Sequence, residues 1–104
     1  MKYIPFTFEE LPVKKMVELD SNIYGIEIKY NEYGKFFTIL LTDENDVILY
    51  STKLVYGKNV FDRIKGLPNV ILIPVNMDDV ESDKILTTEI TAENFGKEVK
   101  LYVA

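Results

Sequence analysis

The sequence is organised around Leu19–Gly57, which reads LDSNIYGIEIKYNEYGKFFTILLTDENDVILYSTKLVYG. Three runs of alternating apolar and polar residues are separated here by two polar turns, Asn31–Gly34 and Asp43–Asp46. Alternation with a period of two is typical of half-buried strands, and Asn, Asp and Gly are favoured in tight turns. The stretch therefore predicts a three-stranded antiparallel meander.

The meander residues that point to the core follow from the alternation. In the first two strands they are Tyr24, Ile26, Ile28 and Tyr30, and then Phe37, Ile39 and Leu41. The third strand carries Ile48, Tyr50, Thr52, Leu54 and Tyr56 on one side, and the sequence leaves open which of its faces is buried.

Further strands flank the meander. Alternating or continuous apolar runs predict them at residues 13–20, 70–75, 84–91 and 99–103. Residues 3–8 are expected to form an edge strand or an extended arm, because Pro5 cannot donate a ladder hydrogen bond. One short helical turn is expected near residues 59–65, with Asn59 as its cap and Gly66 as its stop.

About seven short strands separated by turns predict an all-β fold, a small antiparallel β-barrel or sandwich. A chain of 104 residues is expected to form a single domain, and no linker divides residues 1–104.

Composition excludes several functions. The chain has neither cysteine nor histidine, which removes thiol chemistry, disulfides and the most common general base and metal ligand. Its net charge of −5 argues against nucleic-acid binding through a basic face. No apolar run is long enough for a membrane span, and no secretion signal opens the sequence. Synthesis in a cytoplasm is expected.

Acidic residues are the main candidates for chemistry. The loop Asp78–Asp83 offers carboxylates for a divalent cation, but it lacks the ligand order and central Gly of a calcium loop, so a solvated loop is the preferred interpretation. Asp43–Asp46 is interpreted as a turn for the same kind of reason. No pattern predicts a catalytic carboxylate pair or an activated serine, and we expect neither an enzyme nor a bound cofactor.

Several short segments, taken in order and spacing, resemble the small baseplate plug proteins of contractile-tailed phages and related prophage particles. They are Leu19-Asp20, Tyr24, Lys29-Tyr30-Asn31, the strand from Phe36, Leu54–Asn59 and Gly96–Tyr102. The resemblance spans nearly the whole chain. It departs from the family at Phe36 or Phe37, where Trp is frequent, and in the acidic loop from Asp78.

The resemblance implies a virion structural protein of the tail baseplate, made in the bacterial host cytoplasm. Such a protein helps to close the distal end of the tail tube, contacts hub, spike and tube proteins, and catalyses nothing. A homo-oligomer is compatible with this function.

Contact residues are expected on an N-terminal arm that is dispensable for folding, and on the exposed alternate residues of the Val47–Tyr56 strand. The arm residues are Tyr3, Ile4, Phe6 and Phe8. Core packing would explain each of them equally well.

The alternative function is a β-barrel that binds a small ligand or a carbohydrate. In it, one or more tyrosines would stack on the ligand, the candidates being Tyr24, Tyr30, Tyr33, Tyr50 and Tyr56.

Overall fold

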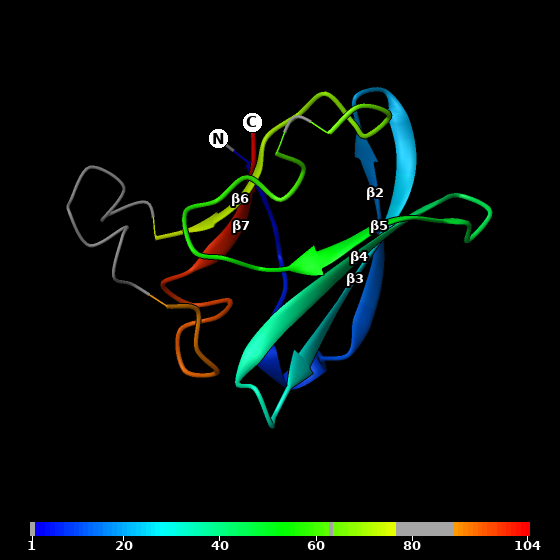
Figure 1. Cartoon of the computed structure of the whole chain (residues 1–104). Helices are drawn as coiled ribbons and strands as arrows, with labels where there is room; N and C mark the ends of the chain where they lie inside the picture. Colours follow the sequence, from blue (N-terminus) through cyan, green and yellow to red (C-terminus); the bar gives the residue numbers. More distant parts are fainter. Residues whose placement is uncertain (1, 63, 77–88) are drawn as a thin grey trace.

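The structure, a computed structural model, describes residues 2–62, 64–76 and 89–104, and within them it is all-β. Seven strands form two antiparallel sheets, and the one helical element is a short 3-10 turn (Figure 1). The elements are β1 (Lys2–Ile4), η1 (Phe8–Glu10), β2 (Val13–Leu19), β3 (Asn22–Asn31), β4 (Phe36–Asp43), β5 (Ile48–Lys53), β6 (Leu72–Val75) and β7 (Lys100–Val103).

The larger sheet has the order β2-β3-β4-β5 and contains the predicted meander. Each strand pairs with its neighbour in sequence, for example Ile28 with Ile39 and Val17 with Tyr24. In the turn between β3 and β4 the Gly34 N–H donates to Asn31 Oδ1 at 2.9 Å, and in the turn between β4 and β5 Asp46 takes a positive φ of 65°, which Asp tolerates better than most residues. The alternation and the turns that predicted the meander are thus confirmed.

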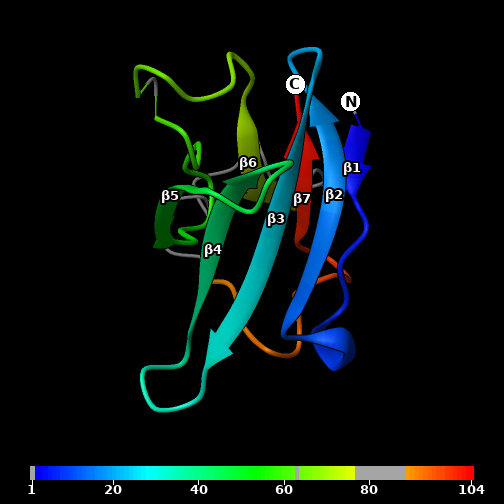
Figure 2. The same cartoon turned by 90° about the vertical axis from the view of Figure 1, so that its right-hand side faces the viewer.

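The smaller sheet has the order β1-β7-β6 and joins the two ends of the chain. β1 is antiparallel to β7, with Lys2 opposite Val103, and β6 pairs with the other side of β7. The smaller sheet lies behind the meander in Figure 2, so that the two sheets form two layers. The sheets do not close into a barrel, so of the two expected architectures the sandwich is the correct one.

In a barrel, a ladder of backbone hydrogen bonds would join β5 to β6. Here the chain after β5 instead leaves the larger sheet and reaches β6 through residues 54–57. The Leu54 N–H still donates to Phe37 O at 2.9 Å, alongside β4. A few residues later the Gly57 N–H donates to Pro74 O at 2.8 Å, so the chain has crossed to β6. Residues 54–57 therefore form a corner of the sandwich.

One core lies between the two layers. It contains the predicted inward residues Ile26, Ile28, Phe37, Ile39 and Leu41, each at most 3% exposed. The smaller sheet and the loops complete the core with Ile4, Phe6, Leu54, Tyr56, Val60, Phe61, Leu72, Val75, Ile90, Phe95, Val99 and Leu101. Burying this apolar surface supplies the main stabilisation of the fold.

A β-bulge in β5 turns Ile48 away from the side on which Tyr50 lies. Leu41 pairs with Tyr50, whereas the next residue, Thr42, pairs with Ile48, so one extra residue lies in β5. The bulge shifts the alternation, since a one-residue change of register reverses the side-chain direction. Tyr50 is therefore half-buried while Ile48 is 66% exposed, and the predicted common face of these two residues is wrong at Ile48.

The helical turn predicted near residues 59–65 is not present in the described part of that stretch. Asn59 does act as a cap, because its Oδ1 accepts from the Phe61 N–H at 3.2 Å. The same oxygen accepts from the Leu72 N–H at 3.0 Å, and the Val60 N–H donates to Leu72 O at 2.7 Å. Asn59 and Val60 thus bond to β6 instead of starting a helix, and a local turn bond remains, from the Ile64 N–H to Phe61 O at 2.9 Å.

The remaining predicted elements are found in part. The strands expected at residues 70–75 and 99–103 appear as the shorter β6 and β7, and the expected edge strand near the start of the chain as β1. Most of the strand predicted at residues 84–91 lies outside the described residues.

Candidate protein-protein interface

The described residues contain no metal-binding or reactive cluster. No group of three His, Cys, Asp or Glu side chains is close enough to hold a metal ion in this part of the chain. Asp43 serves the turn after β4, where its Oδ1 accepts from the N–H groups of Asn45 and Val47 at 2.8 and 3.0 Å. The acidic loop Asp78–Asp83 lies outside the described residues.

The four residues expected on an N-terminal arm fall into different environments. Ile4 and Phe6 are core residues, 8% and 3% exposed, and Phe8 is half-buried. The Phe8 ring lies edge-on to Tyr30, with centroids 5.1 Å apart. Only Tyr3, at 46% exposure, presents a large surface to solvent. Burial of Ile4 and Phe6 favours core packing for these two residues, the other interpretation that the sequence left open.

Gly96 fixes the N-terminal segment against the turn before β7. A Cβ at position 96 would lie 2.4 Å from Phe6 O and 3.1 Å from Thr7 Cα, so only glycine allows this approach. Gly96 also has a φ of +81°, which favours glycine. The close approach of the two backbones explains why a glycine stands in this turn.

Lys15 and Glu10 bind the same segment from the side of β2. Lys15 Nζ donates to Pro5 O, lies 3.1 Å from Glu10 Oε1 and lies 5.0 Å from the centroid of the Phe6 ring. Glu10 Oε1 accepts from the Thr7 N–H at 2.9 Å. This backbone hydrogen bond, and then Lys15, lower the pKa of Glu10 below its ordinary value. Both interactions hold residues 5–10 in place.

The outer face of the smaller sheet carries a row of large side chains, one from each strand. Tyr3, Tyr102 and Ile73 are direct cross-strand neighbours in β1, β7 and β6. The rings of Tyr3 and Tyr102 are 5.7 Å apart at 63°, and Lys100 Nζ lies 4.4 Å from the Tyr3 centroid. We call Tyr3, Tyr102 and Ile73 the aromatic row.

The edge strand β5 and its neighbours expose a second apolar surface. Val47, Ile48 and Leu49, at the start of β5, are 55%, 66% and 40% exposed, and the bulge turns Ile48 outward. Val55, which follows the other end of β5, is 44% exposed. β4 lies on one side of β5, and no strand of the described part of the chain pairs with its other side. We call these four residues the β5 patch. An unpaired strand edge beside apolar side chains can accept a strand from a partner.

The outer face of the meander is partly covered by one lysine. Lys14 extends over Gly25 and pairs with Asp46 in the turn between β4 and β5. A Cβ at position 25 would lie 2.5 Å from Lys14 Cε, so glycine makes room for the crossing. This face is therefore less available for contact than the aromatic row or the β5 patch.

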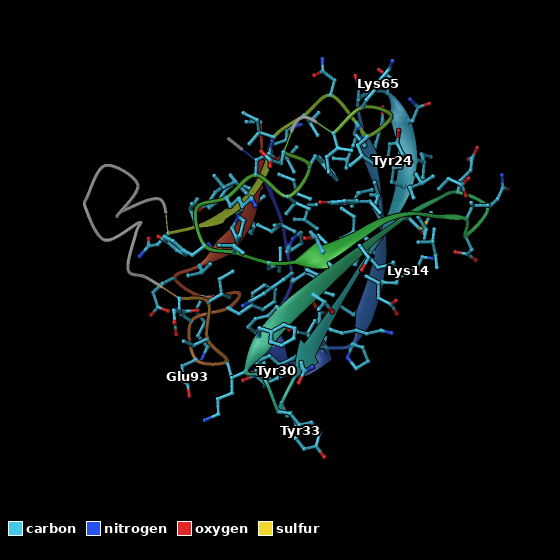
Figure 3. The ribbon with its side chains drawn as sticks, viewed as in Figure 1. Lys14, Tyr24, Tyr30, Tyr33, Lys65 and Glu93 are labelled. Carbon is cyan, nitrogen blue, oxygen red and sulfur yellow. The ribbon has the colours of Figure 1, made fainter. Side chains whose placement is uncertain are left out.

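The five tyrosines of the alternative function do not form one binding site. Tyr56 is buried, and its hydroxyl accepts from the Asn76 N–H at 2.9 Å. Tyr30 packs at 4.8 Å against Phe37 in the core. Tyr24 and Tyr33 lie at opposite ends of the meander (Figure 3). These tyrosines therefore do not form one shared stacking platform, and stacking by a single tyrosine is not tested.

Tyr33 has the most exposed side chain among the thirteen aromatic residues. It is 102% exposed, whereas Tyr3, the next most exposed large aromatic residue, is 46% exposed. Tyr33 lies in the loop between β3 and β4, and this hairpin projects beyond the rest of the molecule (Figures 2 and 3). No ring contact, hydrogen bond or ion pair of the described residues involves its side chain.

The described part of the chain is a small β-sandwich that exposes apolar side chains on its surface. Within that part no helix is long and apolar enough to cross a membrane. The family model described as cyanophage baseplate Pam3 plug gp18 matches residues 1–104, the whole chain. The chain therefore belongs to this family of phage baseplate plug proteins, and the predicted resemblance is confirmed. No curated protein and no solved structure matches the chain.

Proposed function

We propose that this protein is a structural component of a phage or prophage virion that closes or lines the distal end of the tail tube and docks there onto hub, spike or tube proteins. The observation that carries the proposal is the match of the whole chain to the baseplate plug family. That the family consists of baseplate plug proteins supports a place in the tail baseplate and a structural rather than a catalytic role. Synthesis in the host cytoplasm, before assembly, belongs to the same proposal.

The surfaces of the sandwich support docking in two ways. The aromatic row offers two tyrosines and an isoleucine on the outer face of the smaller sheet, and tyrosine is enriched in protein interfaces. Beside the β5 patch, β5 has an edge that pairs with no strand of the described residues, and a neighbouring protein can add a strand there. In this proposal Tyr3 is the N-terminal residue that meets a partner directly, and Ile4 and Phe6 hold it from below.

The test compares phage particles with and without the gene for this protein. Particles lacking the protein are expected to lose infectivity and to have open or incomplete baseplates in electron micrographs, because the plug is missing. Wild-type particles are expected to contain the protein, detected by mass spectrometry in purified tails. Its absence from wild-type tails would overturn the proposal.

A matched pair of variants examines the two contact surfaces. Tyr3→Ala removes the exposed ring of the aromatic row, and Leu49→Lys places a charge in the β5 patch. Each is expected to fold and to enter tails less efficiently than the wild type. Full incorporation of both variants would exclude these two surfaces as the docking sites.

A further inference from the structure

We propose that Tyr33, at the tip of the β3–β4 hairpin, is an anchor that inserts into an apolar pocket of another baseplate protein. The inference rests on the proposed function and deepens it by naming one contact residue. Its partner is a protein whose pocket accepts a phenol ring and offers a carbonyl or carboxylate oxygen to the Tyr33 hydroxyl.

The turn that holds Tyr33 does not require a tyrosine. A tight turn favours Gly, Asn, Asp, Pro or Ser for backbone reasons, and none of these reasons calls for tyrosine. Tyr33 is 102% exposed and buries no surface against its own chain. A large exposed aromatic ring with no role in folding gains free energy only when a partner buries it.

Local contacts hold the backbone at the tip of the β3–β4 hairpin. Asn31 Oδ1 accepts from the Gly34 N–H at 2.9 Å and closes the loop that holds Tyr33. The Phe36 ring lies so close to Gly34 that a Cβ there would be 2.2 Å from the ring, and Lys53 Nζ lies 5.1 Å from the ring centroid. A loop held in this way loses little conformational entropy when it binds.

The base of the hairpin is also fixed. The Tyr30 and Phe37 rings are 4.8 Å apart, and Phe37 stacks on Phe95 at 4.6 Å in the core. The hairpin tip is therefore joined to the sandwich through packed rings. Tyrosines presented from such a fixed backbone are typical interface hot spots.

The charges near the tip favour an apolar contact over an electrostatic one. Glu32 and Lys35 flank Tyr33, both are exposed, and their opposite charges cancel. The partner pocket therefore needs no net charge. Replacing Glu32 should affect binding far less than replacing Tyr33.

The experiment measures how much plug protein enters tails. The phage gene is deleted, variants are supplied from a plasmid, and plug copies per purified tail are counted by quantitative mass spectrometry. Tyr33→Ala is expected to lower incorporation at least about tenfold, the size typical of a lost hot spot. Tyr33→Phe keeps the ring and is expected to fall between Tyr33→Ala and the wild type. Glu32→Ala, in the same tip, is the control and should match the wild type.

Thermal unfolding checks that the variants fold. Tyr33→Ala should keep the wild-type Tm, because the Tyr33 side chain buries no surface against its own chain. Normal incorporation of Tyr33→Ala would overturn the inference and leave the plug function intact. Absence of the wild-type protein from tails would instead overturn the plug function itself.

Cross-linking identifies what surrounds the ring. A photoreactive phenylalanine at position 33 is expected to cross-link to another baseplate protein in assembled tails. A cross-link to a second copy of this chain, or none, would overturn the inference. So would saturable binding of a carbohydrate that Tyr33→Ala abolishes.

Discussion

Gly96 and Gly66 have similar backbone conformations but different surroundings. Their φ angles are +81° and +92°, both in the region that favours glycine. A Cβ on Gly96 would lie 2.4 Å from Phe6 O, whereas a Cβ on Gly66 would meet nothing within 4 Å. The pair therefore separates the cost of the φ angle from the cost of a steric clash.

Gly96→Ala is expected to destabilise the protein by about 3 kcal/mol, since backbone strain and overpacking add. Gly66→Ala has only the strain and should cost about 1–2 kcal/mol. Urea denaturation followed by circular dichroism measures both free energies of unfolding. Equal losses in the two variants would show that the contact between Gly96 and Phe6 contributes nothing.

Glu10 makes stability depend on pH. The hydrogen bond from Thr7 and the nearby Lys15 lower its pKa in the folded protein below the ordinary value of 4.5. The stabilisation is therefore complete above pH 4.5 and is lost as the pH falls through the lowered pKa.

Glu10→Gln should accordingly be less stable than the wild type near pH 7, with the difference shrinking toward pH 3. Denaturation at a series of pH values measures it. Glu9→Gln is the control, because no hydrogen bond or ion pair of the described residues involves Glu9. A difference that stays constant with pH would contradict the assignment.

At the scale of elements, β1 and the residues that follow it place the buried side chains of Ile4 and Phe6 close in sequence to the exposed ring of Tyr3. Ile4→Ala is expected to cost about 2–5 kcal/mol and Phe6→Ala about 3–5 kcal/mol, the range for emptying core positions. Tyr3→Ala should cost less than about 1 kcal/mol, because its ring is 46% exposed.

Thermal or urea unfolding of the three variants measures these differences. Deletion of residues 1–8 should therefore abolish the folded state. A folded deletion variant would restore the view of the segment as a dispensable arm.

The elements that the sequence predicted well are those specified locally. In β3 and β4, alternation and turn residues agree, and Ile26, Ile28, Phe37 and Ile39 are buried as expected. The failures depend on distant contacts. Asn59 bonds to Leu72, thirteen residues away, and the bulge that turns Ile48 outward is a matter of pairing with β4. Neither has a signal in the local sequence.

The candidate interface was predictable only in part. An aromatic or apolar segment near the start of the chain suggested contact residues. Alternation places Tyr3 opposite Ile4 and Phe6, but which side is buried depends on the distant pairing of β1 with β7. Tyr33 was a candidate for ligand stacking. A large aromatic residue within a polar turn was the available signal for its exposure, and its distance from the other tyrosines required the fold.

The net charge of the whole molecule determines whether it binds DNA. At −5 the protein should be repelled by the phosphate backbone, which would suit a component beside a DNA conduit. We expect no binding to duplex DNA in the micromolar range at about 50 mM salt in a fluorescence anisotropy assay. Micromolar or tighter affinity would contradict this prediction.

The pairing of β1 with β7 brings Lys2 opposite Val103, so both ends emerge together, at the opposite extremity from the β3–β4 tip (Figure 2). Adjacent strands are only about 4.8 Å apart, and a few Gly and Ser residues would join the ends without strain. A circular permutant with such a linker, opened between the exposed residues Lys65 and Gly66, should fold with nearly the wild-type Tm. The chain ends therefore lie at one extremity of the molecule and Tyr33 at the other, so a linker or label joined to the ends stays far from Tyr33.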